Sequence, residues 1–542
     1  MSGLFGLASS SDDHTLEAFG DFVPRGGHTS GQCGHSPSIT NEANDTPSPF
    51  ASYSKEVNLL IIGAGVFGLS AALHLLRRGY KHVTVLDRSD VFPAPDAAST
   101  DINKIVRSSY SDAFYTRLAK EAIELWKGDN DTWNGCYFES GVAVLGNLSP
   151  SSDGYAAKAY RNDIELGQHV ITIENHSDFA PFFDGVKLGE AFKCGYVNLE
   201  GGWAFASKGL ECARKTVEQL GGRVVGGKKV VQLVFDDDDP GTNEVVGGEG
   251  KCKGVKLEGG MVLDADVTIV ATGAWTGSLF GEEGTGLGEG KVVATAHWVV
   301  MVQLSEEEAV SYRKIPVVLD FNTGFYLFPP NHDNIVKMAF HNSGFVDSQP
   351  LASAPSNTPS SPTVPTPRTT PLCPGTHLAI PHHLSDQHRQ CLTAILPELG
   401  AKPFKGTRLC WYTDTPDANW IIDWHPKRKG LMFATGGSGH GYKVGVASEW
   451  RLALPLCPRT RYHSTYRPLF GGCLQFLPVL GRLVADRFEE RWTTISSNAF
   501  HSGGGRGEDP SRRVRFLPYS RKIQDLTCSR EAHTLLQAIM GS

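Results

Sequence analysis

The stretch Leu59–Arg88 constrains the fold more than any other, because it combines an apolar strand, a glycine-rich turn, a helical pattern and a second apolar strand. Gly63 permits a tight turn, Gly65 lets a pyrophosphate approach the backbone, and Gly68 lets the helix pack against the sheet. The free N–H groups and positive dipole at the start of the helix favour phosphate binding. Asp87 ends the second strand, about 20 residues after the last glycine, where a carboxylate can bind ribose hydroxyls. The stretch therefore predicts a dinucleotide site.

Length and composition indicate a globular protein with two or three domains. The chain has 542 residues, 40% of them hydrophobic and 20% charged, which is enough for a substantial core. A net charge of −7 without a basic face gives no indication of nucleic-acid binding. The 11 cysteines show no CxxC pair or zinc-like spacing, and scattered cysteines suit a reducing compartment. We therefore expect neither a metal site nor a nucleic-acid partner.

Hydropathy alone would permit Leu59–Leu76 to span a membrane. The glycines in this stretch and His74 favour a buried strand followed by a helix instead. The N-terminus has no basic segment followed by an apolar one, so a secretory signal is not indicated. We expect no association with a membrane.

Further strands and helices follow the glycine turn. Val267–Trp275 is an apolar strand that runs into a glycine turn, so we expect a parallel strand whose turn lies beside the cofactor. The acidic run Asp236–Gly250 is typical of a solvated hairpin tip rather than of a metal site. The apolar periodicity predicts the following additional elements: helices over Tyr115–Lys127 and Lys208–Gln219, and strands over Tyr137–Leu148, Arg223–Val225 and Val230–Phe235.

The second half of the chain has a different character. Val292–His341 is rich in strands and predicts an antiparallel sheet in a second domain that can cover a ligand. The Ser/Pro/Thr-rich stretch 348–376 is typical of a loop or a disordered insertion. A short helix is expected over His388–Leu396. The glycine loop Gly436–Lys443 should precede a helix, and Phe476–Phe488 supplies one only after an interruption.

These elements predict an α/β fold. One part is a Rossmann-type dinucleotide-binding domain, and the other is an α+β substrate domain built on an antiparallel sheet. Residues outside both are expected to form a disordered leader, an anomalous insertion and an irregular tail. The assigned ranges are 56–110, 206–290, 406–443 and 476–490 for the first domain, 111–205 and 291–405 for the second, and 1–55, 444–475 and 491–542 for the leader, insertion and tail.

With these motifs the chain resembles the flavin-dependent amine oxidases of the D-amino-acid oxidase superfamily. The similar group comprises monomeric sarcosine oxidase, L-pipecolate oxidase, saccharopine oxidase and fructosyl amino acid oxidase. The resemblance covers Val57–Val346 and Pro397–Lys443 and resumes at Phe476–Glu490. It implies FAD as the cofactor. The motifs are the nucleotide unit, STDINKIVRSSY, VTIVATGAWTG, GFYLFPP with VKMAFH, RLCWYTDTPDANWIID and ATGGSGHGYK.

The resemblance implies catalytic and substrate-binding roles for four residues. Lys337 matches the lysine that activates oxygen, where a fixed ammonium stabilises the anion formed from O2. The sequence leaves open which face of its strand Lys337 occupies. Lys443 matches the lysine that binds the substrate carboxylate, and His341 matches an active-site histidine. Lys104 stands where sarcosine oxidase has arginine and fructosyl amino acid oxidases have lysine, so the resemblance does not single out sarcosine.

The resemblance also implies how the flavin is held. Cys410 matches the cysteine that is covalently attached to the flavin, and the alternative is a buried structural cysteine. Lys104 and Arg107 lie three residues apart, so one could face the flavin and the other a phosphate or the substrate, while a structural ion pair is the alternative for Arg107. The expected cofactor-binding residues are Gly63, Gly65, Gly68, Asp87, Arg88, Ser99, Thr100, Lys104, Arg107, Val225, Gly273, Trp275, Cys410, Gly437, Gly439, His440, Gly441 and Lys443.

The implied reaction oxidises the C–N bond of an N-substituted amino acid, such as sarcosine or L-pipecolate, to an imine and reduces O2 to H2O2. Fructosyl amino acids and saccharopine are alternative substrates. A dehydrogenase with another electron acceptor and an inactive flavoprotein are alternative functions. We expect a monomer whose partners are a small-molecule amine and O2. Its C-terminus is not the Ser-Lys-Leu-like ending of peroxisomal relatives, so both a cytoplasmic and a peroxisomal location stay open.

Val444–Gln475 interrupts the resemblance, because in the family the glycine loop leads directly into the helix that begins here at Phe476. The stretch has one acidic residue, several arginines and no clear period. Looping out such a segment costs little entropy, but this one would lie beside the predicted substrate lysine. We interpret it as translated intron sequence, and a transcript that retains its codons would contradict this interpretation.

Overall fold

The computed structural model describes residues 53–236, 250–280, 292–350, 363–369, 379–416, 418–439 and 473–490. The predicted tail and all but the last three residues of the predicted leader lie outside this range. Those three residues belong to the folded part: the Tyr53 ring stacks on Trp424 and Phe488, with centroids 5.8 and 5.3 Å apart. Lys55 Nζ lies 2.6 Å from Glu489 Oε1. Tyr53 and Lys55, at the end of the predicted leader, are therefore part of the folded structure, because contacts from residues distant in sequence hold their side chains.

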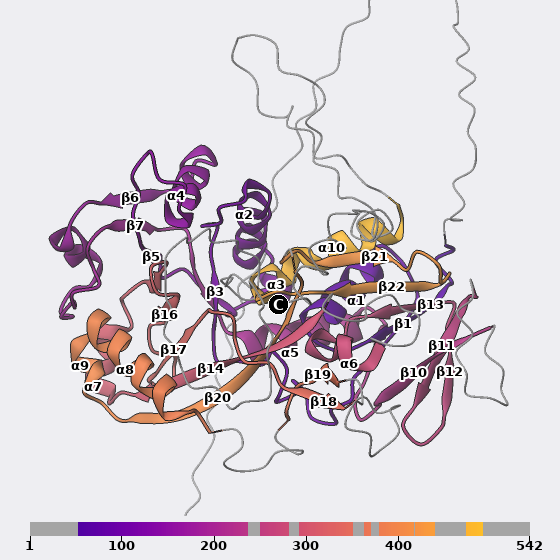
Figure 1. Ribbon diagram of the computed structural model, residues 1–542. Helices are drawn as coiled ribbons and strands as arrows, with labels where there is room; N and C mark the ends of the chain where they lie inside the picture. The colour runs from indigo at the N-terminus through magenta and orange to yellow at the C-terminus, as the bar shows by residue number, and fades with distance from the viewer. Residues whose placement is uncertain are drawn as a thin grey trace, which may run out of the picture. The chain divides into compact units, whose positions relative to one another are not determined.

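Six strands form a largely parallel sheet around β1 (Asn58–Ile62), in the order β21-β22-β13-β1-β2-β9 (Figure 1). β1 pairs in parallel with β2 (His82–Leu86) on one side and β13 (Val267–Val270) on the other. Every residue of β13 and all but the first of β1 are buried, as the continuous apolar runs require. The outer strands are β9 (Arg223–Val225), β22 (Leu431–Thr435) and the antiparallel β21 (Ile421–Trp424).

Helix α1 (Val66–Arg77) connects β1 to β2 and packs between α5 (Ala206–Gln219) and α10 (Leu477–Phe488). Contact with α10 is close: a Cβ on Gly481 would lie 1.8 Å from the backbone oxygen of Ser70. The Ser70 hydroxyl donates to Leu477 O at 2.6 Å and accepts from Gly481 N at 2.7 Å. The helix after the interruption therefore packs on the helix of the glycine turn, although the residues 440–472 that precede it lie outside the described range.

A second sheet has eight strands in the order β20-β14-β17-β16-β15-β5-β7-β6. Its longest strands, β14 (Val293–Gln303) and β20 (Phe404–Asp414), pair along almost their whole length (Figure 1). All neighbouring pairs are antiparallel except β5 with β15. The sequence did not predict this parallel pair. The other strands are β5 (Val142–Leu145), β6 (Val170–Ile173), β7 (Gly195–Asn198), β15 (Val317–Asp320), β16 (Phe325–Leu327) and β17 (Ile335–Phe340).

Several predicted elements differ from the observed ones in their bounds, and two differ most. The single strand expected over Tyr137–Leu148 is two strands, β4 (Tyr137–Phe138) and β5, which pair in different sheets. Gly141 between them has φ +77°, a conformation that ends an extended strand. The helix expected over His388–Leu396 begins earlier, as α8 (His382–Ile395). In both cases the apolar pattern was right but tertiary pairing fixed the ends.

The predicted fold class is confirmed: a parallel nucleotide-type sheet is joined to a mainly antiparallel second sheet. The assignment of residue ranges to two domains stays a prediction. The remaining elements are α2 (Ala113–Gly128), α3 (Asn130–Trp133), α4 (Tyr155–Glu165), α6 (Thr276–Phe280), α7 (Glu306–Tyr312) and α9 (Pro397–Gly400), the strands β3 (Lys104–Val106), β8 (Gly202–Ala204), β10 (Val230–Phe235), β11 (Cys252–Leu257), β12 (Val262–Asp264), β18 (Ser348–Pro350) and β19 (Thr363–Pro365), and the 3-10 turns η1 (His176–Phe182), η2 (Gly273–Trp275) and η4 (Cys473–Phe476).

Candidate active site

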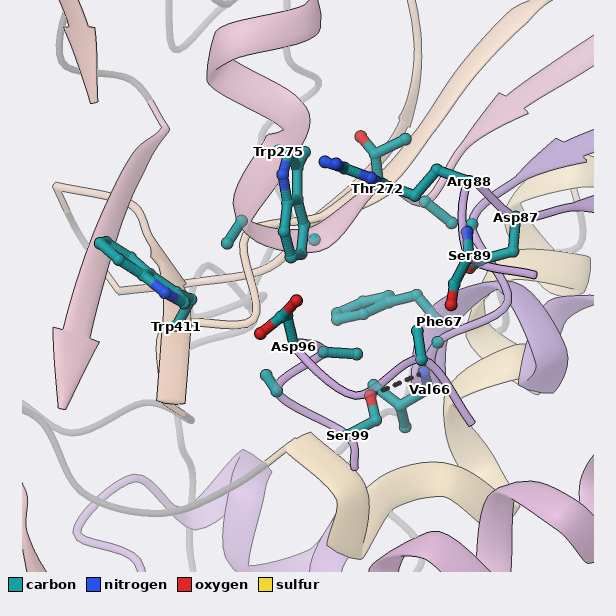
Figure 2. Close-up of a pocket in the computed structure, with 18 of the residues that line it drawn as sticks. Val66, Phe67, Asp87, Arg88, Ser89, Asp96, Ser99, Thr272, Trp275 and Trp411 are labelled. Atoms are coloured by element: carbon teal, nitrogen blue, oxygen red, sulfur yellow. Dashed lines mark hydrogen bonds between the residues drawn. The ribbon is translucent and has the colours of Figure 1, made fainter. Parts of the chain in front are cut away.

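A cavity of about 430 Å³ lies at the carboxyl ends of β1, β2 and β13 (Figure 2). In open α/β sheets this edge, next to the strand at which the order of connections reverses, is where ligands bind. Residues predicted from the sequence line it from five segments. They are Gly63, Gly65, Asp87, Arg88, Ser99, Lys104, Gly273, Trp275, Gly437 and Gly439.

The glycine turn allows no side chain at two of its positions. Gly63 has φ +104°, and a Cβ there would lie 2.4 Å from Ala271 O. A Cβ on Gly68 would lie 1.9 Å from Gly63 O, so Gly68 acts through helix packing and does not line the cavity. Gly65 differs, because the only atom within 4 Å of an added Cβ is Ser99 Oγ at 3.5 Å. Its open side therefore faces the cavity, which leaves room for a ligand to approach the backbone.

Two side chains fix the mouth of this turn. Ser99 Oγ accepts a hydrogen bond from Val66 N at 3.1 Å and so binds the first amide of α1. The Asp87 carboxylate accepts from Ala64 N at 2.8 Å and from Ser89 N at 2.9 Å. Two backbone amides therefore hold the Asp87 carboxylate in place at the cavity wall, and its binding of ribose hydroxyls stays a prediction.

Aromatic rings form the opposite wall. The Arg88 guanidinium lies 5.1 Å from the centroid of the Trp275 ring, which stands in the turn after β13. In the view of Figure 2, Asp96 lies below Trp275, with Trp411 to the left and Arg88 to the right of Trp275. Trp411 Nε1 donates to Arg368 O at 2.9 Å, which fixes that ring. The cavity thus combines flat apolar surfaces with charged groups, as sites for planar, charged ligands do.

Next to the cavity lies a buried charge cluster, formed by Asp101, Lys104, Lys337 and Arg408. Asp101 Oδ2 is 2.6 Å from Lys104 Nζ, 2.7 Å from Lys337 Nζ and 3.7 Å from Arg408 Nη1. Lys337 Nζ also donates to Asn103 O at 2.6 Å. One carboxylate therefore holds two lysines that are 233 residues apart in sequence, and the cluster carries excess positive charge.

The environment of the cluster sets its ionisation. Burial disfavours the charge of Asp101, but Lys104, Lys337 and Arg408 outweigh it and hold the pKa of Asp101 well below its usual range. Burial also opposes the charge of Lys104, and the Asp101 carboxylate overcomes this and raises the pKa of Lys104. For Lys337 burial prevails: it lowers the pKa to about 7, aided by Lys104 and opposed by Asp101. Lys337 is thus a lysine whose charge changes near neutral pH.

The tertiary structure also decides the face on which Lys337 lies. Its neighbours Val336, Met338 and Phe340 point into one hydrophobic core, whereas Ala339 points into another that contains Cys410 and Tyr412. Because alternate residues of a strand share a face, Lys337 lies on the side of Ala339 and Cys410. The sequence predicted the alternation and left the face open.

Cys410 lies in β20, opposite His297 of β14 in the register of the second sheet. Its thiol is buried, with Sγ 3.9 Å from Lys104 Nζ. Cys410 itself does not line the cavity, but Lys104 and the following Trp411 and Tyr412 do. The thiol thus lies one side chain away from the cavity and next to a permanent cation.

Three rings form a stack above this end of the second sheet. The His297 ring lies 4.1 Å from that of Tyr412 and 5.7 Å from that of His341, to which it is parallel within 2°. Burial and then Lys104 lower the pKa of His297 to about 3, so it is neutral. A Cβ on Gly439 would lie 2.5 Å from Tyr412 and 2.8 Å from His341. Gly439 therefore packs directly against these rings, and the role of His341 as an active-site residue stays a prediction.

Several predicted site residues do not line the cavity. Arg107 is fully buried, donates to Tyr155 Oη at 3.0 Å and stacks on the Tyr110 ring at 4.2 Å. Thr100 donates to Ala94 O at 2.7 Å. Val225 ends β9 and is packed against a hydrophobic core. The predicted residues His440, Gly441 and Lys443 lie outside the described residues.

The end of the predicted insertion belongs to the folded part. Leu474 lines the cavity, and Gln475 is buried. Gln475 Oε1 accepts from Arg107 N at 3.1 Å, and Gln475 O accepts from Trp126 Nε1 at 2.8 Å. Gln475, predicted as the end of the insertion, is therefore held in the fold by contacts from residues remote in sequence. The rest of the stretch, 444–472, lies outside the described residues.

Asp101, His297 and Tyr326 were missed by the sequence prediction. Asp101 stands three residues before Lys104 in the same motif, and a carboxylate at that spacing could have been recognised as a partner. His297 and Tyr326 gave no such signal, because strand register brings them to Lys104 and Cys410. Burial raises the pKa of Tyr326 to about 12, so its hydroxyl stays protonated.

Residues 58–453 match the FAD dependent oxidoreductase family, and the chain belongs to this family. It is 28% identical over 407 residues to L-saccharopine oxidase of Schizosaccharomyces pombe. This match covers 71% of this chain and 86% of the relative. Peroxisomal sarcosine oxidase of Mus musculus is 25% identical over 397 residues, covering 71% and 88%. The crystal structure of fructosyl amine:oxygen oxidoreductase (Amadoriase I) of Aspergillus fumigatus has a TM-score of 0.63 and 27% identity, covering 81% and 88%. These findings confirm the resemblance, and the chain is an FAD-dependent oxidoreductase.

The cavity fits FAD on three observations. The open side of Gly65 gives a pyrophosphate access to the start of α1, where amide groups favour phosphate. Asp87 is held at the position suited to the ribose. Both polar atoms of the Asn103 side chain are buried without a hydrogen-bond partner among the described residues, although buried polar groups need one. Asn103 thus has capacity to bind a group that the described chain does not supply.

Among the described residues, no helix is long and apolar enough to cross a membrane. The same residues contain no group of three or more His, Cys, Asp or Glu side chains placed to bind a metal ion.

Proposed function

We propose that this protein oxidises a secondary amine that carries a carboxylate, an N-substituted amino acid such as sarcosine or L-pipecolate, and uses O2 as the electron acceptor. The products are an imine and H2O2. The buried charge cluster beside the cavity supports this proposal most strongly. Its excess positive charge in a dry site suits both the reduction of O2 to an anion and the binding of a carboxylate.

Lys337 is the residue that we assign to oxygen reduction. FAD, when bound, supplies the redox chemistry. The Lys337 side chain is completely buried, and two hydrogen bonds to Asp101 and Asn103 O fix its ammonium. A fixed cation needs no reorganisation when negative charge develops nearby, so it stabilises that charge more than water would.

We further propose that Cys410 carries the flavin covalently. Its thiol is buried, and its Sγ lies 3.9 Å from Lys104 Nζ, a residue that itself lines the cavity. The two residues that follow it, Trp411 and Tyr412, line the cavity. Both observations support the role that the RLCWYTDTPDANWIID motif implied.

For the substrate we assign carboxylate binding to Lys443 and contact with the amine end to His341. The support for Lys443 is its motif, because the residue lies outside the described range. His341 has structural support, since it meets Gly439 of the same glycine loop. We also keep Lys104 as a catalytic candidate, because it lines the cavity and its Nζ lies 3.9 Å from Cys410 Sγ.

A bulkier substrate, a fructosyl amino acid or saccharopine, is the second candidate. Lys104 favours it, because the residue is lysine where sarcosine oxidase has arginine. Similarity to L-saccharopine oxidase of Schizosaccharomyces pombe and to Amadoriase I of Aspergillus fumigatus also favours it. In the monomer that we propose, one chain forms the whole site, and sedimentation at the mass of a single chain would support this.

The first test is the absorbance spectrum of the purified full-length protein before and after acid precipitation. We expect a yellow pellet from the unchanged protein and a yellow supernatant from a Cys410→Ser variant. A buried cysteine outside the site, Cys252→Ser, serves as the control and should leave the colour in the pellet. Release of the flavin from the unchanged protein would contradict the covalent link, but it would still show that the protein binds a flavin.

The second test is a peroxide-coupled screen of sarcosine, L-pipecolate, saccharopine and fructosyl amino acids. Peroxide with one amine class identifies the substrate. Substrate-dependent bleaching with slow reoxidation in air would contradict the oxidase and favour a dehydrogenase. Colourless full-length protein, together with a yellow and active variant that lacks residues 444–472, would assign inactivity to this stretch. Cytoplasmic and peroxisomal locations both fit the proposal, and microscopy of the full chain would distinguish them.

A further inference from the structure

Two cysteines outside the cavity lie in direct contact. Cys136 Sγ donates a hydrogen bond to Cys212 Sγ at 3.6 Å. Cys136 precedes β4, in the segment that leads from α3 to the small sheet, whereas Cys212 lies in the middle of α5. They are 76 residues apart in sequence. Neither residue lines the cavity, and neither was given a role above.

The two thiols differ in access. Cys136 is completely buried, and its backbone is fixed by bonds from Cys136 N to Trp133 O at 3.0 Å and from Phe205 N to Cys136 O at 2.7 Å. Cys212 is half-buried on the face of α5 toward this segment. A reagent in solution therefore reaches Cys212 first, with Cys136 held behind it.

The surroundings favour ionisation of the accessible thiol. The hydrogen bond from Cys136 and the nearby ammonium groups of Lys208 and Lys215 lower the pKa of Cys212 to about 7, against burial and Glu211. The same arrangement raises the pKa of Cys136, which stays protonated as the donor. Lys208 is fixed close by, since its Nζ donates to Gly135 O at 3.0 Å.

We infer that Cys212 and Cys136 form a peroxide-sensitive thiol pair, in which Cys212 is the reactive thiol and Cys136 the resolving thiol. The ligand class is a hydroperoxide, with H2O2 as the simplest member. The inference does not rest on the proposed substrate, because it requires only peroxide from any source.

The chemistry balances in two steps. The Cys212 thiolate attacks one oxygen of H2O2, the O–O bond breaks, and hydroxide leaves, so that Cys212 becomes a sulfenic acid. The sulfur of Cys136 then attacks Cys212 Sγ, the S–O bond breaks, and the departing hydroxide takes the proton of Cys136 to give water. Two thiols lose two electrons, and H2O2 is reduced to two waters. The sulfur separation must shorten from 3.6 Å to about 2 Å, a side-chain movement rather than a rearrangement of the fold.

Cys391 provides a matched comparison. It is half-buried in α8, and burial raises its pKa to about 11, so its thiol stays protonated near neutral pH. Cys391 should react with peroxide more slowly than Cys212, although both residues are half-buried. Cys194, also half-buried, donates to Gly146 O at 3.5 Å and offers a second comparison.

The test treats the full-length protein with H2O2 in the absence of amine substrate. Remaining thiols are blocked with iodoacetamide, and the unreduced digest is analysed by mass spectrometry. We expect a peptide pair linked through Cys136 and Cys212 that disappears on reduction. In a Cys136→Ser variant, dimedone should trap a sulfenic acid on Cys212, at least tenfold more than on Cys391.

Two outcomes would overturn the inference. One is equal oxidation of Cys212, Cys194 and Cys391 without a linked peptide. The other is alkylation of Cys212 in the unchanged protein that shows no inflection between pH 6 and 8, since a thiol of ordinary pKa would react mainly above that range. The alkylation measurement needs no variant, so it stays decisive if Cys136→Ser fails to fold. Failure here would leave the proposed amine oxidation untouched.

Discussion

The glycine turn, Gly63–Gly68 with Asp87, is built from one stretch of chain and is held by close backbone packing and by hydrogen bonds to its backbone amides. The buried charge cluster of Asp101, Lys104, Lys337 and Arg408 is built from three segments, and charge holds it together. The turn excludes side chains by contacts as short as 1.9 Å. The cluster instead depends on the single carboxylate of Asp101, which interacts with all three cations and neutralises part of their charge. Substitutions in the close-packed turn should thus unfold the protein. Substitutions in the charge cluster should instead change the pKa values of its members and the rate of the reaction.

The largest effect is expected at the turn. Gly68→Ala would place a methyl group against Gly63 O and should cost more than about 4 kcal/mol, leaving little folded flavoprotein. Gly79→Ala at the other end of α1 is the control: Gly79 has φ +88° and nothing within 4 Å of an added Cβ, so only backbone strain of about 1–2 kcal/mol remains. Flavin content and denaturant unfolding measure both. Equal stability of the two variants would contradict the packing argument.

The next effect should come from the carboxylate of the cluster. Asp101→Asn leaves buried lysines without their counter-charge, and we expect a loss of about 3–5 kcal/mol in the free energy of unfolding. The control is Glu121→Gln, which removes the partner of Arg482 in a pair whose side chains are 41% and 30% exposed. Exposed pairs contribute only about 0–1 kcal/mol. If both variants unfold at the same denaturant concentration, Asp101 does not hold the cluster together.

A further difference between the two sites is expected in the pH dependence of oxygen reduction. Because the pKa of Lys337 is lowered to about 7, its ammonium is present below that pH and is lost as pH rises through it. The rate constant for reoxidation of the reduced holoenzyme by O2 should therefore fall above neutral pH. Asp101 opposes the lowering, so its removal should move the midpoint to lower pH.

Lys337→Met is the control for this profile. It should reduce the reoxidation rate constant about 100-fold or more and abolish the inflection near pH 7. Stopped-flow mixing of reduced protein with oxygenated buffer gives the rate constant directly. A profile that keeps its inflection in Lys337→Met would assign the titration to another group.

The smallest effect is expected at the wall beside the turn. Arg88→Ala removes a guanidinium 5.1 Å from the Trp275 ring and should weaken this wall by about 0.5–1 kcal/mol, a two- to fivefold change in FAD affinity. Reconstitution of apoprotein with FAD in a Cys410→Ser background measures it. An effect above tenfold would mean that Arg88 binds the cofactor directly.

The strand–turn–helix–strand unit could be predicted from the sequence almost completely. β1 (Asn58–Ile62) and β2 (His82–Leu86) coincide with the two apolar runs that were interpreted as strands. The glycine spacing, the apolar runs and the terminal Asp87 are adjacent in sequence, so local geometry largely determines their arrangement. The turn after β13 was predicted from the same kind of local signal.

The second sheet was predicted only in outline. Its strands were recognisable, but not the parallel pair of β5 with β15 or the division of Tyr137–Leu148 between two sheets. Pairing between strands depends on contacts across hundreds of residues, and strand periodicity carries no information about partners. For the same reason the face of Lys337 stayed open.

The sequence by itself determined the cofactor class, the parallel sheet that binds it and the identity of Lys337, Cys410 and His341 as candidates, because each stands in a compact motif. Only the tertiary structure decided that Asp101 joins Lys104 to Lys337, that Arg107 supports the core rather than the cavity wall, and that Cys136 meets Cys212. These are interactions between segments distant in sequence. Their energies depend on separation and burial, which exist only once the chain has folded.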